Sequence, residues 1–189
     1  RKFAGSPPAN LIISIDAISL VWYRMVLASA ALTLFMWGFK IPFRLSSKHL
    51  IIMMICGVLI ALHWVFFFHA VKVSNVSVTL SVMSTGAFIT ALIEPIVYKR
   101  SFDFYEIIFG LVVVIALGMI IQTEYRYIDG MFFAFVAVLL SVAFTLINGK
   151  VVHKSDARVM SVIQLGTGAI CMSTILFFQD KLSVDLFSI

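Results

Sequence analysis

The sequence predicts an all-α membrane protein, a polytopic helical bundle of about six transmembrane helices. Two observations lead to this prediction. Hydrophobic residues make up 62% of the 189 residues and charged residues only 12%, whereas soluble domains are about half apolar and about one quarter charged. The apolar residues are also gathered in long runs, and about 20 residues of helix are enough to cross the hydrocarbon core. Lipid is therefore the expected solvent for much of the surface.

Six apolar runs meet this length or come close to it, and each predicts one helix. A helix satisfies its own backbone groups in lipid, and none of the runs alternates as a barrel strand does. The connections are short, so consecutive helices are expected to be antiparallel neighbours. The predicted helices are 17–39, 50–71, 76–98, 104–121, 129–147 and 159–178.

The charges in the loops predict an orientation. Lys and Arg are concentrated in the loops after the first, third and fifth runs, and the positive-inside rule places these loops in the cytoplasm. The expected location is a bacterial inner (plasma) membrane. The cytoplasmic loops carry Lys40, Arg44, Lys48, Lys99, Arg100, Lys150, Lys154 and Arg158, whereas the opposite loops carry Lys72 and Arg126.

The two ends of the chain fit this orientation less well. Residues 1–16 would lie outside the cell, although a short basic tail ordinarily stays inside. We therefore expect this segment to be an extracytoplasmic lead-in that follows a missing first helix. Residues 179–189 form a polar tail, and truncation is expected there as well.

Motifs for catalysis, cofactors and metals are not found in the sequence. It has no phosphate-binding glycine loop, HExxH, CxxC or serine nucleophile elbow, and we predict no catalytic residue, cofactor or metal site. Cys56 and Cys171 lie inside apolar runs and are expected to be small packing residues. The net charge of +5 comes from short clusters without a continuous basic face, so nucleic acid is not an expected partner.

Four segments carry a resemblance to a known family. They are WYRMVLAS (Trp22 to Ser29), the run from Ala61 to Pro95, FYEIIFGLVVVIALGMII (Phe104 to Ile121) and LINGKVV (Leu146 to Val152). These segments resemble the drug/metabolite transporter superfamily and, within it, the EamA-type permeases. The resemblance implies a ten-helix transporter of two inverted five-helix repeats, of which this chain holds the second to seventh helices. Residues 17–121 would complete the first repeat and residues 129–178 would begin the second.

The resemblance implies a permease that moves small metabolites, such as amino acids or amphipathic drugs, by alternating access. Protons are a candidate coupling ion, and no particular oligomeric state is implied. One alternative is an intramembrane enzyme that modifies lipids or isoprenoids with His63 as base; another is a truncated fragment without transport activity. The enzyme needs a second catalytic group beside His63, and Glu94 is expected at a different depth. We therefore predict no enzyme activity.

Helix 50–71 predicts part of a substrate site through His63, Trp64 and Phe67. His63 is expected near the bilayer centre, where an ionisable group is costly unless it faces protein or a water-filled cavity. Its titration near neutral pH would suit a proton-coupled step. The alternative is a neutral histidine that is hydrogen-bonded to a neighbouring helix.

Helix 76–98 predicts the other part of the site. Ser77, Ser81, Ser84 and Thr85 are spaced so that their hydroxyls are expected on one face. Each hydroxyl could bond to a backbone carbonyl one turn earlier, or Ser84 and Thr85 could line a cavity beside Gly86. The predicted substrate-binding residues of this helix are Ser81, Ser84, Thr85 and Phe88.

Two charged residues join His63 as candidates for coupling or gating. Glu94 precedes Pro95, where a kink is expected, and it either pairs with Lys99 or Arg100 or acts as a gate. Arg24 could extend its charge outward along a long stem or hold an anionic substrate group. Weaker polar candidates are Asn148 and Gln164, and four glycines are expected to permit close helix approach: Gly110, Gly118, Gly166 and Gly168.

Overall fold

The computed structural model describes residues 17–152 and 155–178, which form helices joined by short turns. This part of the chain contains no β-strand, and six of its helical segments are long and apolar enough to cross a membrane. The predicted all-α fold is thus confirmed. The lead-in 1–16 and the tail 179–189 lie outside the described residues.

The helices begin and end close to the predicted positions. Four first turns are fixed by side chains that accept a backbone N–H which the helix itself leaves without a partner. The capping residues are Ser46, Asn75, Asp103 and Asp156, which accept from residues two or three positions later at 3.4, 2.9, 2.9 and 2.9 Å. The elements are α1 (Ala17–Gly38), α2 (Ser47–Val73), α3 (Val76–Met83), α4 (Thr85–Tyr98), α5 (Phe104–Thr123), the 3-10 turn η2 (Tyr125–Tyr127), α6 (Ile128–Val151) and α7 (Ala157–Phe178).

The sequence predicted one uninterrupted helix over 76–98, but the structure divides this span at Ser84 into α3 and α4. Ser84 keeps a right-handed helical conformation, with φ −62° and ψ −23°, so both parts still belong to one span. The Ser84 hydroxyl donates to the Ser81 carbonyl at 2.6 Å, and the Thr85 hydroxyl donates to the Val82 carbonyl at 2.7 Å. Hydroxyls that bond to helix carbonyls compete with the backbone ladder. Helix α4 itself continues through Pro95 to Tyr98.

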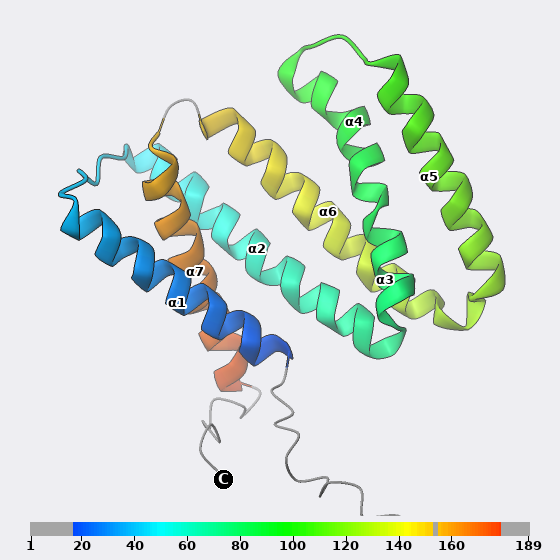
Figure 1. The fold of residues 1–189 in the computed structure, drawn as a ribbon, viewed down its shortest axis with the longest axis horizontal. Helices are drawn as coiled ribbons and strands as arrows, with labels where there is room; N and C mark the ends of the chain where they lie inside the picture. Colours follow the sequence, from blue (N-terminus) through cyan, green and yellow to red (C-terminus); the bar gives the residue numbers. More distant parts are fainter. Residues whose placement is uncertain (1–16, 153–154, 179–189) are drawn as a thin grey trace, which may run out of the picture.

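The main packing partners are not consecutive helices (Figure 1). Helix α6 packs against α2 on one side and α3 and α4 on the other, whereas α7 packs against both α1 and α2. The prediction that consecutive helices are neighbours is confirmed for α4 and α5. It is wrong for α1 and α2, for α5 and α6 and for α6 and α7, which touch only slightly. A short loop fixes where two helix ends meet, but the shapes of the helix faces decide which helices pack along their length.

Small residues determine the close contact between α2 and α7. A Cβ atom added to Gly57 would lie 2.5 Å from the carbonyl oxygen of Gln164 and 2.8 Å from Cβ of Thr167, so only glycine fits. Gly168 faces the Gly57 carbonyl, as expected for a close approach, and Gly166 faces Ser29 of α1.

The predicted role is confirmed for Gly110 but not for Gly118. Gly110 is buried against the Phe88 ring, whereas a Cβ on Gly118 would meet nothing within 4 Å among the described residues. Gly118 is thus not a packing position in this structure.

Side chains inside the bundle are small or flexible, and those outside are apolar. Cys56 lies in a buried cluster with Met53 and Met160, while Cys171 packs at the edge of another cluster; both thiols are free, as expected. Helix α5 is apolar from Ile107 to Ile121, yet its buried positions amount to Gly110. A helix that is apolar on all sides along most of its length and largely exposed within the bundle fits a lipid surrounding.

The basic loops lie at one end of the bundle. Figure 1 shows the α1–α2, α4–α5 and α6–α7 connections at this end and the α2–α3 and α5–α6 connections at the other. We call the first the basic end, because it carries Lys40, Arg44, Lys48, Lys99, Arg100 and Lys150. Lys154 lies outside the described residues.

Candidate substrate site

Four ring-bearing residues of α2 form a contiguous group in the half of the span away from the basic end. The ring centroids of His63 and Trp64 are 5.3 Å apart, and those of Trp64 and Phe67 are 5.7 Å apart. Phe68 stacks on Trp64 at 5.7 Å. We call His63, Trp64, Phe67 and Phe68 the aromatic cluster. The structure thus brings together the three site residues predicted on this helix.

His63 connects the aromatic cluster to α6. Its Nδ1 lies 2.9 Å from the Ala137 carbonyl oxygen. A carbonyl only accepts hydrogen bonds, so Nδ1 carries the proton, and Nε2 of the neutral ring is left as an acceptor. The structure shows the hydrogen bond to a neighbouring helix that the sequence offered as an alternative, and this bond still leaves one nitrogen for a ligand.

Arg24 of α1 reaches the aromatic cluster from the neighbouring helix. Its guanidinium carbon lies 4.4 Å from the centroid of the Trp64 ring. A cation over an indole face contributes about 0.5–1 kcal/mol at an exposed site, and Arg24 is exposed. The structure therefore places this predicted residue beside Trp64, with its charge held over the ring.

The predicted hydroxyl stripe divides into two faces. Ser84 is exposed and Ser81 half-buried, whereas Thr85 is 4% exposed and lies on the side that packs against α6. The expectation of one shared face is wrong for Thr85, because it follows Val78 and Val82 around the helix. Ser81 donates to the Ser77 carbonyl at 2.8 Å, so the hydroxyls of Ser81, Ser84 and Thr85 all bond to carbonyls of their own helical span.

Phe88 is separate from the aromatic cluster. Its ring packs against Gly110 at the contact between α4 and α5, and its neighbours there come from the outer edge of the bundle. The structure therefore does not place Phe88 in one wall with Trp64 and Phe67.

Glu94 forms the expected ion pair at the basic end. Its carboxylate lies 3.4 Å from Nε of Arg100, and Arg100 also donates to Glu106 at 3.0 Å. The hydrogen bond with Glu106, followed by attraction to both carboxylates, raises the pKa of Arg100. The partner is Arg100 rather than Lys99, because Lys99 ends α4 in a left-handed conformation with φ 56°.

Asn148 and Gln164, which are only weaker candidates by sequence, are joined in the structure. Gln164 is only 6% exposed, and its amide donates to the Asn148 side-chain oxygen while lying 2.9 Å from the Met53 sulfur. Three helices, α2, α6 and α7, thus meet at one buried amide. Their separation in sequence explains why no local pattern indicated the pair.

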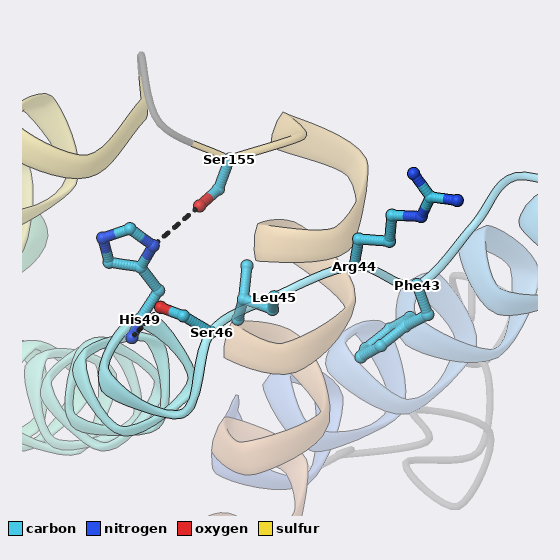
Figure 2. A pocket seen from close by; sticks show the side chains of 6 residues that line it. All are labelled: Phe43, Arg44, Leu45, Ser46, His49 and Ser155. Atoms are coloured by element: carbon cyan, nitrogen blue, oxygen red, sulfur yellow. Dashed lines mark hydrogen bonds between the residues drawn. The ribbon is translucent and has the colours of Figure 1, made fainter.

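A shallow groove at the basic end was also not predicted. Figure 2 shows its lining side chains, which come from the loop before α2, the start of α2 and the loop before α7. The volume of the groove is about 520 Å³. Its lining shares no residue with the aromatic cluster. Across the described ranges, His, Cys, Asp and Glu side chains form no group of three that could hold a metal ion. The groove is lined by Phe43, Arg44, Leu45, Ser46, His49 and Ser155.

Comparison with known sequences decides the family. The sequence profile of the EamA-like transporter family matches residues 8–122, which is more than half of the 189 residues. The chain belongs to the EamA-like transporter family. It is an integral, multi-pass membrane protein of a family of small-molecule transporters, not of enzymes. Comparisons with curated proteins and with solved structures gave no match.

The EamA match covers most of the candidate site. Arg24, the aromatic cluster, the α3–α4 hydroxyls and Glu94 lie inside it, whereas Ala137 and the Asn148–Gln164 pair lie beyond it. The resemblance noted in the sequence is confirmed, including the EamA-type assignment.

Proposed function

We propose that this chain is a permease that moves small amphipathic metabolites across an inner or plasma membrane by alternating access. The observation that carries the proposal is the aromatic cluster, in which His63 keeps a free acceptor nitrogen within an apolar span. A polar group is rarely retained at such a depth without a ligand or a partner helix. Nδ1 of His63 binds the partner helix α6, and Nε2 is left for a ligand.

The chemistry of the aromatic cluster fits amino acids or amphipathic drugs. Trp64 and Phe67 supply flat apolar surfaces, and Nε2 of His63 accepts a hydrogen bond from an ammonium, amine or hydroxyl group. Arg24, beside Trp64, provides a positive charge for a carboxylate. Apolar walls with a few placed polar groups are typical of small-molecule sites.

His63 is also the group we propose for proton coupling. When the ring gains a proton, Nε2 changes from acceptor to donor, while the Nδ1 bond to Ala137 can persist. Proton uptake would therefore change which substrate groups are bound without breaking the contact between α2 and α6. Since α6 begins the proposed second repeat, protonation of His63 would affect contacts in both repeats.

The enzyme alternative gains no support from the geometry. Glu94 is held by Arg100 at the basic end, and His63 bonds to a backbone carbonyl instead of a second titratable group. Glu94 and Arg100 remain candidates for gating, because their exposed pair lies where one side of a carrier would open.

Transport assays on His63→Ala and Trp64→Ala test the proposed site. The chain is reconstituted in proteoliposomes, and uptake of labelled amino acids and of a cationic dye is measured with and without a proton gradient. Each variant should reduce uptake about tenfold, as expected for the loss of about 1.4 kcal/mol of binding free energy. His63→Ala should also abolish the response to the proton gradient.

His69→Ala is the matched control, since His69 lies on the same helix, is exposed and packs on Phe133 at 4.4 Å instead of on the aromatic cluster. It should transport like the unmodified chain. Equal transport by all variants would refute the site, and no uptake by the unmodified chain would favour the non-transporting alternative.

A further inference from the structure

Arg44 differs from the other arginines of the described ranges. Arg100, Arg126 and Arg158 each pair with a carboxylate, and Arg24 lies over Trp64. Within the same ranges Arg44 has neither kind of partner, and it lines the groove at the basic end. A guanidinium carries five donors in a planar fork that matches phosphate geometry. Its unmatched charge therefore points to an anionic ligand.

The groove supplies further hydrogen-bond donors, and its lining contains no acidic side chain. Figure 2 shows His49 and Ser155 facing each other at one end, with Arg44 and Phe43 at the other. The Ser46 hydroxyl accepts the His49 N–H at 3.4 Å, so its own proton remains available to a ligand. No lining residue is acidic. The lining thus offers a phosphate group a cation at one end of the groove and hydroxyl groups towards the other, without a competing carboxylate.

The apolar part of the groove indicates that the ligand has a hydrocarbon portion. Phe43 is 57% exposed, and Leu45 lines the groove between the polar ends. Nearby at the end of α1, Trp37 and Phe39 are 81% and 71% exposed. Exposed aromatic residues next to basic residues are typical of the membrane–water interface. The groove is therefore placed at headgroup depth, beside the acyl chains of the leaflet that faces the basic end.

We propose that this groove binds the phosphate group of an anionic phospholipid, with Arg44 on the phosphate and Phe43 along the first acyl carbons. Basic pockets between transmembrane helices bind anionic headgroups by this combination of charge and depth. A zwitterionic lipid is a poorer ligand, because its own cation offsets the phosphate charge. Since His49 and Ser155 approach within 3.4 Å across the groove, the bound lipid would lie against loops of both repeats. The proposal does not depend on transport.

Native mass spectrometry of the detergent-solubilised chain tests the proposal. Phosphatidylglycerol, phosphatidylcholine and inorganic phosphate are titrated separately against the unmodified chain, Arg44→Gln, Arg44→Lys and Lys99→Gln. Lys99→Gln removes the same charge from the same end but outside the groove. The unmodified chain and Lys99→Gln should prefer phosphatidylglycerol about tenfold, and Arg44→Gln should lose this preference. Arg44→Lys keeps the charge but not the planar fork, so it should retain part of it.

Three results would overturn the proposal. One is equal binding of the two lipids by the unmodified chain, and another is an equal loss of preference in Arg44→Gln and Lys99→Gln, which would indicate general charge attraction. The third is binding of inorganic phosphate that depends on Arg44 and displaces phosphatidylglycerol, which would assign the groove to a soluble anion. If Arg44→Gln does not fold, Arg44→Lys against Lys99→Gln decides between the same outcomes.

Discussion

At the scale of single residues, His63 shows how a polar group is retained inside an apolar span. An unpaired buried polar group costs about 1–3 kcal/mol, and the Ala137 carbonyl offsets this for one nitrogen only. Asn148 and Gln164 satisfy each other in the same way, with Met53 as a third neighbour. The difference is that Gln164 is enclosed, whereas His63 is half-buried among rings. Of Gln164 and His63, the histidine is therefore the residue that a ligand can reach.

Asp156 leads to a residue-scale prediction about pH. The Arg158 side chain, followed by its backbone N–H, lowers the pKa of this carboxyl to about 2. A lowered pKa in the folded state stabilises the protein above the unfolded value of about 3.9, and this stabilisation is lost as the pH falls from there towards 2. Asp156→Asn should therefore lower the Tm clearly at pH 6 and much less at pH 2. Thermal unfolding in detergent across this range measures the difference.

Asp103→Asn is a suitable comparison for Asp156→Asn, because Asp103 also precedes a helix and accepts one N–H at 2.9 Å without an arginine of its own in an ion pair. At pH 6, Asp103→Asn should lower the Tm less than Asp156→Asn, because no arginine forms an ion pair with Asp103 among the described residues. A Tm difference between Asp156→Asn and the unmodified chain that stays constant from pH 6 to pH 2 would contradict the prediction.

At the scale of elements, α2 organises the molecule. It packs against α6 along one side and α7 along the other, and it carries the aromatic cluster, Gly57 and Met53. In the repeat division predicted from the sequence, both of these neighbours belong to the second repeat. Motion of the second repeat relative to the first, as alternating access requires, would therefore act directly on α2.

Gly57→Ala tests the α2–α7 contact. The added methyl group would overlap the Gln164 carbonyl and Thr167, and such overpacking typically costs about 1–3 kcal/mol. Gly118→Ala is the control, because a Cβ there meets nothing within 4 Å of the described residues and alanine favours helix by about 1 kcal/mol. Thermal unfolding in detergent should show a lower Tm for Gly57→Ala and no decrease for Gly118→Ala. Equal Tm values for the two variants would contradict the packing argument.

At the scale of the whole molecule, the bundle is an open row of helices with apolar sides. Helix α5 lies at one edge against α4 and α1 at the other against α7 (Figure 1). Large exposed side chains such as Leu27, Phe109 and Ile170 cover these surfaces. Exposure on this scale is destabilising in water and neutral in lipid, so the same surface that would aggregate in buffer is solvated in a bilayer.

The basic end leads to a topology prediction. Single cysteines that replace Lys99 and Lys150 should react from the cytoplasmic side of intact cells or oriented vesicles, and one that replaces Arg126 should react from the opposite side. The native thiols are a small background, because Cys56 is buried and Cys171 half-buried. A membrane-impermeant maleimide measures the labelling. Reaction of the Lys99 and Lys150 positions from opposite sides would refute the arrangement of the spans.

The sequence by itself determined the number of spans, their approximate ends and the family. These depend on local quantities: apolar run length, capping residues such as Ser46 and Asp103, and loop charge. It also indicated that His63, Trp64 and Phe67 belong together, because neighbouring positions on one helix remain neighbours in space.

Only the tertiary structure decided which helices pack side by side. It placed α6 and α7 against α2, separated Phe88 from the aromatic cluster and buried the Thr85 side of its span against α6. It also joined Asn148 to Gln164 and formed the groove beside Arg44. In lipid, apolar faces do not discriminate between partners, so close packing at small residues such as Gly57 selects them. That selection depends on shapes matched across distant segments, which no local pattern in the chain encodes.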